Sequence, residues 1–400
     1  MREMVSEKPY RFVPPYRGRG WWRVLKRGLP WYLNRYWGIE RVDIIGAEWL
    51  DRSLADGHGV LLAANHPRPC DPFVMGELSR RVRRPLFSMA SWHLFMNGGW
   101  QAWTMRRLGA FSVFREGIDL QAVGAAVDIL VSGERPLLIF PEGVVSRTND
   151  RLNPLLEGVA LIARKAAARR SKAQTGDVAI HPVFLRYRFH GDLGASVEPV
   201  LAEIERRLTW QPAPQLPLIQ RIAKVGQSLL SLKEIEYFGH PETGGLDERL
   251  GRLIDHLLAP LERQWLNGEH VSNTVQRVKR LRGAIMPTLS AGELSDVDKS
   301  HRWRQLADCY LAQQLSWYPP DYLASDPTPE RILETVERFE EDLTDRARIH
   351  RPLSARVEVG EAIMVAGERG RRPANEDLLE ELEAAMKRMI VESGAARQTV

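Results

Sequence analysis

A histidine and an aspartate spaced for acid–base chemistry follow the first strongly apolar run of the chain. Asn65 and His66 come directly after the run GVLLAA at 59–64, and Asp71 stands five residues beyond the histidine. A carboxylate on one ring nitrogen of a histidine fixes its tautomer and leaves the other nitrogen to act as a base. The carboxyl end of a buried strand is also where open α/β sheets bind their ligands. The spacing therefore predicts a general base at His66.

The same residues have plainer interpretations. Asp71 could only cap the helix that it begins, with His66 an ordinary loop histidine, and Cys70 could be a nucleophile that His66 activates. The chain has no GxSxG, GxxxxGK[ST], HExxH or CxxC motif, which excludes several common hydrolase, nucleotide and metal sites. Its two cysteines, Cys70 and Cys309, exclude a disulfide scaffold, and no metal site is expected.

The elements around His66 alternate between short apolar runs and helix-period stretches, which is typical of an α/β fold. Strands are predicted at 59–64, 85–90, 136–140 and 178–187, and helices at 71–81, 94–107, 118–132 and 157–170. Hydrophobic residues then recur at helical spacing. A strand at 355–360 and a helix at 377–391 close the chain, and this lone strand must rejoin the first sheet to find hydrogen-bond partners.

We therefore expect a central, mostly parallel or mixed sheet flanked by helices, with an all-helical insertion before the last strand. The predicted parts are a basic aromatic segment at 1–45, the α/β core at 46–204, the helical insertion at 205–350, and the closing strand and helix at 351–400. A composition of 44% hydrophobic and 27% charged residues excludes disordered, collagen-like and coiled-coil classes. No apolar run is long enough to cross a membrane, and the start of the chain does not resemble a signal peptide.

The first 40 residues concentrate positive charge, with nine Lys or Arg against three Glu, whereas the whole chain carries +5. They also hold eight Trp or Tyr residues, Tyr10, Tyr16, Trp21, Trp22, Trp31, Tyr32, Tyr36 and Trp37. Trp and Tyr favour the headgroup zone and basic side chains are attracted to anionic lipid, so the segment predicts an interfacial anchor. A packing arm and a nucleic-acid-binding segment are the alternatives. We expect a cytoplasmic protein, peripheral on the inner face of the cell membrane.

Four blocks in a fixed order carry a resemblance to a known family. They are Asn65-His66 with Asp71, the run GAFSVFR that ends in Arg115, FPEG at 140–143, and the strand at 178–187 with Pro182 inside it. Together they resemble the glycerolipid acyltransferase family over about residues 45–200, and in the closing segment near 351–391. The resemblance implies acyl transfer from a thioester to a hydroxyl, with His66 as general base and Asp71 orienting it. It implies no cofactor, because acyl-CoA or acyl carrier protein is the co-substrate.

The resemblance also implies which residues bind the substrate. Arg115 would hold an acceptor phosphate, because a guanidinium can contact two phosphate oxygens at once. Glu142 and Gly143 would shape the acceptor pocket, although Glu142 could equally brace a loop. The predicted substrate-binding set is Asn65, Arg68, Arg115, Glu142, Gly143, Ser146 and Arg147.

Two departures from the family pattern concern the acceptor. Where the family usually reads FPEGTRS, this chain has Val144 and Val145 before Ser146 and Arg147, and Arg68 stands where serine is common. We expect a glycerol-phosphate-type acceptor resembling lysophosphatidic acid, used in phospholipid synthesis; a different lipid or a small molecule could also serve as acceptor. Acyl-thioester hydrolysis and lipid binding without catalysis are the competing functions. The expected partners are the acyl donor, a lysophospholipid and an anionic membrane surface, and no nucleic acid.

Overall fold

The structure is a computed structural model, and it describes residues 10–96, 98–115, 117, 119–271, 273–290, 294–318, 321–323, 327–365, 367 and 375–395. The chain divides into two compact units. One comprises residues 2–114, 119–191 and 349–400, and the other comprises 115–118 and 192–348. We call the first the sheet unit and the second the helical unit. Parts of the predicted anchor (1–9) and of the closing segment (366, 368–374 and 396–400) lie outside the described residues.

The described residues of the sheet unit form an eight-stranded, mostly parallel sheet, in which seven strands have the order β1-β7-β6-β2-β5-β3-β4 and β8 lies off this path. Strands β6, β2, β5, β3 and β4 run parallel, whereas β7 is antiparallel to β6 and parallel to β1. The last strand, β8, pairs antiparallel with the start of β6. Their bounds are β1 Ile39–Ile45, β2 Gly59–Ala64, β3 Phe87–Ser91, β4 Ala110–Val113, β5 Leu137–Ile139, β6 Val178–Phe189, β7 Leu353–Val359 and β8 Ile363–Val365. The predicted mostly parallel sheet flanked by helices is confirmed.

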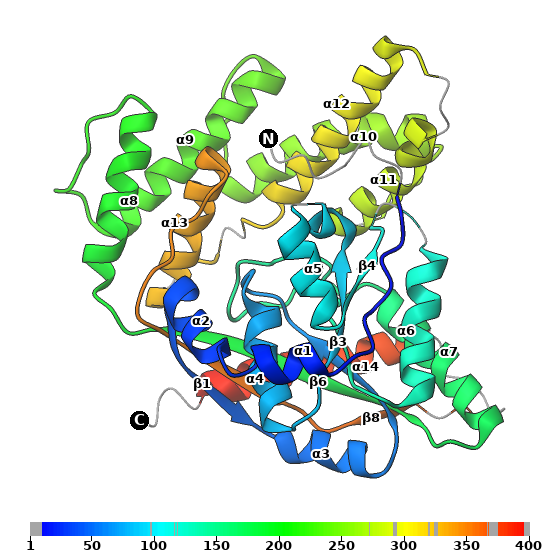
Figure 1. Ribbon diagram of the computed structural model, residues 1–400. Helices are drawn as coiled ribbons and strands as arrows, with labels where there is room; N and C mark the ends of the chain where they lie inside the picture. Colours follow the sequence, from blue (N-terminus) through cyan, green and yellow to red (C-terminus); the bar gives the residue numbers. More distant parts are fainter. Residues whose placement is uncertain are drawn as a thin grey trace. The chain divides into compact units, whose positions relative to one another are not determined.

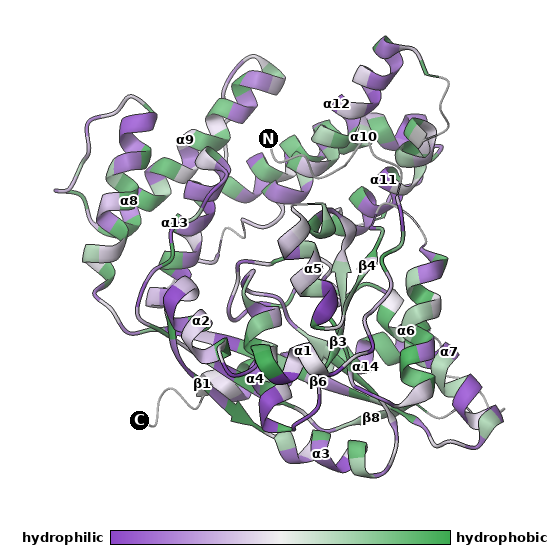
Figure 2. Cartoon of the chain, viewed as in Figure 1, coloured by the Kyte–Doolittle hydropathy of each residue, from purple (hydrophilic) through white to green (hydrophobic). Residues whose placement is uncertain are grey.

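Helices cover both faces of this sheet, and Figure 1 shows α1, α2 and α4 in front of the strands and α14 behind them. All residues of β2 and eleven of the twelve residues of β6 are buried, as expected for parallel strands covered on both sides. On the rear face α6, α7 and α14 share one hydrophobic core with the strands, and α6 is coloured mainly hydrophobic in Figure 2. The helices are α1 Gly20–Leu25, α2 Leu29–Trp37, α3 Ala47–Ala55, α4 Asp71–Arg81, α5 Gly99–Arg107, α6 Leu120–Ser132, α7 Gly158–Ala173 and α14 Asn375–Ala395.

The first described residues form an arm that packs on strand β4. Ser112 donates its backbone N–H to the Val13 carbonyl at 3.0 Å, and the Val13 N–H donates to Ser112 Oγ at 2.8 Å. The Tyr10 hydroxyl donates to the buried carboxylate of Asp119. Residues 10–13 therefore pack against the sheet unit, as the packing-arm alternative expects. The helices that follow, α1 and α2, place Trp21 and Trp31 at the surface.

In the described residues of the helical unit there are six helices, and buried ion pairs join several successive ones. These helices are α8 Leu193–Arg207, α9 Leu218–Phe238, α10 Leu246–Trp265, α11 Thr274–Ser290, α12 Asp296–Leu315 and α13 Pro329–Thr344. Three carboxylates each pair with an arginine of the next helix, in the order Glu205–Arg221 at 2.8 Å, Glu234–Arg249 at 2.6 Å and Glu262–Arg277 at 2.7 Å. The helical region thus begins with α8, earlier than the boundary predicted at 205. No helix in the described part of the chain is both long and apolar enough to span a bilayer.

Candidate active site

The candidate site is the loop that connects β2 to α4 in the sheet unit. Strand β2 lies in the middle of the sheet, between β6 and β5, so its carboxyl end is surrounded by the ends of parallel strands. Ligands bind at this edge of open α/β sheets because the loops that leave the strands converge there. Pro67 and Pro69 restrict the backbone of the loop that holds His66.

His66 and Asp71 form a hydrogen-bonded pair. Nδ1 of His66 lies 2.7 Å from Oδ2 of Asp71; the Asp71 side chain is fully buried, and 15% of the His66 side chain is exposed. None of the described residues hydrogen-bonds Nε2 of His66. The carboxylate therefore holds the proton on Nδ1, and Nε2 is left to accept a proton from a substrate hydroxyl. Capping does not account for Asp71, because Cys70 is the N-cap residue of α4 and no side chain caps that helix.

Two further donors hold the Asp71 carboxylate. Its Oδ2 atom accepts the Arg68 backbone N–H at 2.9 Å, and its Oδ1 atom accepts the hydroxyl of Tyr187, which is buried in β6. Burial and the nearby Asp71 charge raise the pKa of Tyr187 well above its ordinary value, so the phenol keeps its proton and remains a donor. Sequence reasoning missed Tyr187, whose one signal was its place in the strand that contains Pro182.

The ring plane of His66 is fixed by Phe140, which follows β5. The two rings are stacked with centroids 4.0 Å apart and an interplanar angle of 17°. Stacking on one face and the Asp71 hydrogen bond at one edge leave the imidazole a single orientation. Phe140, the first residue of the FPEG block, thus contributes to the site through packing.

Glu142 braces two loops. Its Oε1 atom accepts the His66 backbone N–H at 2.9 Å, and its Oε2 atom accepts the Asn153 N–H at 3.0 Å. Burial raises the pKa of Glu142 to about 7, although both backbone hydrogen bonds oppose that shift. Because each Glu142 oxygen accepts a backbone N–H from a different loop, Glu142 has the bracing role considered above. Gly143 has a φ of +72°, a left-handed backbone conformation that favours glycine.

Buried amides fasten the two site loops to β6. The Asn65 side chain donates to the Leu185 carbonyl at 3.0 Å and accepts from the Leu185 N–H at 2.6 Å. Asn149, which sequence reasoning missed, makes the same pair of bonds to the backbone of Tyr187. Ser146 is buried as well, and its N–H donates to the His66 carbonyl at 2.8 Å. Asn65 and Ser146 thus position the loops, and their predicted contact with substrate stays a prediction.

The predicted cations fall in different places. Arg68 is buried beside the pair, with its guanidinium 5.3 Å from the centre of the Tyr187 ring. Arg147 follows Ser146 in the same loop, half-buried, with a φ of +54°. Arg115 is grouped with the helical unit and not with the sheet unit, so its part in phosphate binding stays a prediction.

Cys70 is unsuited to a nucleophilic role. It is fully buried, its Sγ atom lies 3.5 Å from the Tyr187 hydroxyl, and burial raises its pKa to about 12. A cysteine nucleophile must be a thiolate, which this environment disfavours. Among the described residues no group of His, Cys, Asp or Glu is arranged to hold a metal ion.

A mostly parallel α/β sheet with a His–Asp pair at the end of its central strand β2 is an arrangement suited to general-base chemistry. Residues 41–186 match the family model named Acyltransferase. The chain is also 30% identical over 139 residues to the 1-acyl-sn-glycerol-3-phosphate acyltransferase of Streptococcus pneumoniae (strain ATCC BAA-255 / R6), a match that covers 34% of this chain and 50% of that protein. This chain thus spans half the length of that relative. Both comparisons support an acyltransferase domain of the glycerolipid type at residues 41–186.

Proposed function

We propose that this chain transfers a fatty acyl group from an acyl thioester to a hydroxyl of a glycerol-phosphate-type lipid in phospholipid synthesis. The observation that carries the proposal is the His66–Asp71 pair, because it leaves Nε2 of a held imidazole to act on a hydroxyl. The name of the Streptococcus pneumoniae relative supports an acylated glycerol phosphate as the class of acceptor.

In the proposed reaction Nε2 of His66 takes the acceptor hydroxyl proton while the oxygen attacks the thioester carbonyl. The new carbon–oxygen bond forms a tetrahedral intermediate, whose collapse breaks the carbon–sulfur bond. The imidazolium then returns its proton to the leaving thiolate, so atoms and charge balance without a covalent acyl-enzyme. Asp71 stabilises the imidazolium, and the Tyr187 hydroxyl and Arg68 N–H keep Asp71 in place.

The proposed substrates make separate demands on the chain. An acceptor phosphate needs a cation, and Arg115, Arg68 and Arg147 are the candidates. The donor would be acyl-CoA or acyl carrier protein, for which no particular residue is assigned. A lipid acceptor requires contact with a bilayer, so we place the protein on the cytoplasmic membrane surface, where its basic, aromatic N-terminal segment would meet anionic lipid.

Product analysis tests this function. Purified full-length protein is incubated with a labelled acyl-CoA, with and without 1-acylglycerol 3-phosphate, and in parallel with labelled acyl carrier protein. We expect a labelled diacylated lipid only when the acceptor is present. Labelled free fatty acid released equally with and without acceptor would identify a thioester hydrolase instead. A panel of other lysolipids and small alcohols then ranks the acceptors.

A further inference from the structure

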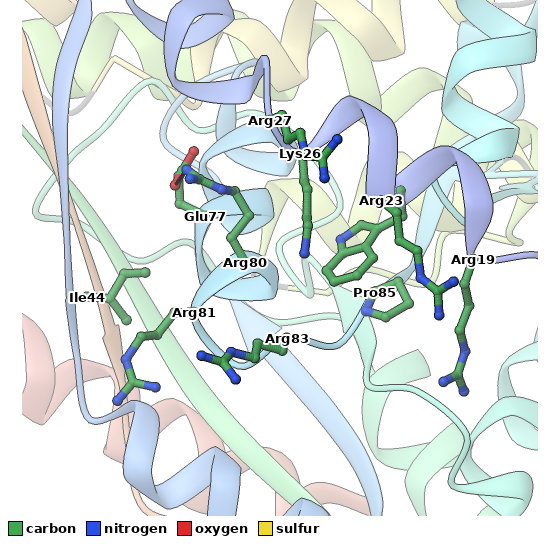
Figure 3. Close-up of a pocket in the computed structure, with 11 residues that line it drawn as sticks. Arg19, Arg23, Lys26, Arg27, Ile44, Glu77, Arg80, Arg81, Arg83 and Pro85 are labelled. Carbon is green, nitrogen blue, oxygen red and sulfur yellow. Dashed lines mark hydrogen bonds and ion pairs between the residues drawn. The ribbon is translucent and has the colours of Figure 1, made fainter.

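A strongly basic groove lies between α1 and the last turn of α4 in the sheet unit (Figure 3). It has a volume of about 720 Å³, and seven of its eleven lining residues are lysine or arginine, whereas Glu77 is its one acidic lining residue. Its walls also include Trp22, Ile44 and Pro85. We call this feature the basic groove.

Most of the positive charge in the basic groove is not neutralised by the protein. Arg80 pairs with Glu77, Arg81 lies 3.6 Å from Asp51, and Arg19 lies 3.7 Å from Glu134. The remaining cations, Arg23, Lys26, Arg27 and Arg83, form no ion pair with any residue that the structure describes. Like charges gathered in one groove repel one another, so binding of an anion there would be favourable.

Two consecutive hydrogen bonds join α1 to α4 and to the loop that follows α4. Trp22 Nε1 donates to Ser79 Oγ at 2.8 Å, and Ser79 Oγ donates to the Arg84 carbonyl at 2.7 Å. The Lys26 ammonium lies 4.1 Å from the centre of the Trp22 ring. Figure 3 shows the Lys26 side chain extending from α1 into the groove. These contacts fix α1 against α4, so the two helices that carry the cations are arranged before any ligand binds.

The basic groove is separate from the acyl-transfer site. Arg80 stands nine residues after Asp71 on α4, which places the two about 14 Å apart along the helix. Pro85 lies just before β3, at the amino end of a parallel strand, whereas His66 follows the carboxyl end of β2. The groove therefore lies at the amino ends of the parallel strands, and the His66 loop lies at their carboxyl ends.

Exposed aromatic side chains beside the groove indicate what kind of anion it takes. On α1, Trp21 and Val24 are exposed, and on α5 Trp100 is 77% exposed. The Trp21 ring packs on Trp103 with centroids 4.7 Å apart, which joins the two helices into one surface. Tryptophan favours the headgroup zone of a bilayer, and guanidinium groups bind phosphate oxygens. An acidic protein would match the charge of the groove but not the exposed rings.

We propose that the basic groove binds the phosphate of an anionic phospholipid headgroup, with the exposed aromatic side chains of α1 and α5 in the bilayer interface. This inference rests on the proposed function, which places the protein at a membrane surface, and it names the site that binds the lipid. The bound headgroup would hold the surface formed by α1 and α5 against the bilayer.

Vesicle binding by charge-matched variants tests the groove. The full-length triple variant Arg23→Gln, Lys26→Gln, Arg83→Gln removes three groove cations, and the control Lys165→Gln, Arg169→Gln, Lys172→Gln removes three exposed cations from α7. On phosphatidylcholine vesicles containing phosphatidylglycerol, we expect the groove variant to bind about tenfold more weakly or worse and the control to stay within about twofold of wild type. A charge-keeping variant, Arg23→Lys, Lys26→Arg, Arg83→Lys, should retain most binding. Circular dichroism confirms that each variant is folded.

Other results would overturn the proposal. If the groove variant and the α7 control lost vesicle affinity equally, net charge alone would explain the binding, and the groove would not be a specific site. Thermal stabilisation of wild type by inorganic phosphate that the groove variant lacks, together with unchanged vesicle binding, would assign the groove to a soluble phosphate. Loss of binding to purified acyl carrier protein with vesicle binding retained would assign it to an acidic protein. Binding is measured without acyl donor and also on His66→Ala, so a failure of acyl transfer is seen separately.

Discussion

At the scale of the residue, one nitrogen of His66 carries the proposed chemistry and its neighbours determine how well it can act. Replacing His66 by alanine removes the base and should lower kcat about 10²–10⁴-fold. Asp71→Asn should also lose much of the activity, because the amide no longer fixes the tautomer. Cys70→Ala is the control and should keep most activity, and all three are measured by acyl transfer with melting curves. Near wild-type turnover in folded His66→Ala would contradict general-base catalysis here.

Tyr187 is a positioning residue whose effect can be isolated. Tyr187→Phe deletes only the hydroxyl that donates to Asp71, while the buried ring under Arg68 is retained. A hydrogen bond to a charged group stabilises by about 1.5–3 kcal/mol, so kcat should fall about tenfold or more while both KM values stay the same. A purely structural role would instead lower the melting temperature and leave kcat of the folded protein unchanged.

Glu142 predicts a pH-dependent stability. Its pKa is about 7 in the folded protein, against 4.5 as the ordinary value, because burial disfavours the charged form. The folded state therefore holds this proton more tightly than the unfolded state, so the stabilising contribution is full below pH 4.5 and is lost as the pH rises toward 7. Glu142→Gln does not titrate. Between about pH 5 and pH 8 the wild type should lose up to about 3 kcal/mol relative to this variant, measured by denaturant unfolding. The substitution Glu157→Gln, at an exposed position, serves as control. If the free energy of unfolding varied with pH in the same way for wild type and Glu142→Gln, the raised pKa of Glu142 would be contradicted.

The sequence was informative about residues that lie close together along the chain. His66 and Asp71 are five residues apart at a strand–helix junction, so their pairing follows from local geometry. Tyr187 and Asn149 reach the same loop from distant segments, and no short-range pattern connects them to His66. The choice for Glu142 between pocket wall and brace likewise depended on Asn153, whose N–H only the folded loop brings near.

At the scale of the element, buried strands and well-delimited helices were predictable. Strand β2 and helix α4 have the predicted bounds because the first is fully buried and the second begins at the loop that follows it. Three strands were missed, β1, β4 and β8. Strands β1 and β4 lie at the edges of the sheet, where strands are partly exposed or short and apolar patterning is weak, and β8 is only three residues long. The helix predicted at 94–107 is interrupted because Gly98 has a φ of +118°, outside the helical region, so α5 begins only at Gly99.

The buried ion pairs of the helical unit make a prediction about how α8 and α9 are joined. Glu205 and Arg221 are almost fully buried and share two hydrogen bonds, of 3.1 and 2.8 Å. Glu205→Ala leaves a buried guanidinium without its charge partner and should lower the free energy of unfolding by about 3–5 kcal/mol. The double variant Glu205→Leu, Arg221→Met should recover most of that loss, apart from the bond that Glu205 accepts from the Ala213 N–H.

The matched control for this pair is Glu203 on the same helix. Its ion pairs with Arg206 and Arg207 are exposed to solvent, so Glu203→Ala should cost less than about 1 kcal/mol. Denaturant unfolding followed by circular dichroism measures all three proteins. Similar losses for Glu203→Ala and Glu205→Ala would show that burial does not decide the strength of the α8–α9 pair.

At the scale of the whole molecule, the chain order hides the organisation of the sheet unit. Strand β7 comes from beyond residue 350 and lies between β6 and β1, so the closing segment completes the sheet that the first half of the chain begins. A lone strand late in the sequence must find partners, which is why its return could be predicted. Its insertion between two strands, rather than at an edge, could not, because pairing order depends on the whole tertiary structure.

Charge distribution over the whole molecule gives the last prediction. The formal net charge is +5, which is too little to hold a chain of 400 residues on a bilayer unless the charge is concentrated on one face. Raising salt from roughly 0.1 M to roughly 1 M shortens the Debye length from about 10 Å to about 3 Å, so binding to anionic vesicles should weaken strongly. Trp100→Ala, at a position that is 77% exposed, should weaken binding to neutral and anionic vesicles by a similar factor at both salt concentrations, without lowering the melting temperature. Deleting residues 1–40 is a poorer test, because it also removes the bonds that Tyr10 and Val13 make to the core. Salt-independent binding to anionic vesicles would contradict the electrostatic contribution, and an unchanged affinity of Trp100→Ala would remove α5 from the bilayer interface.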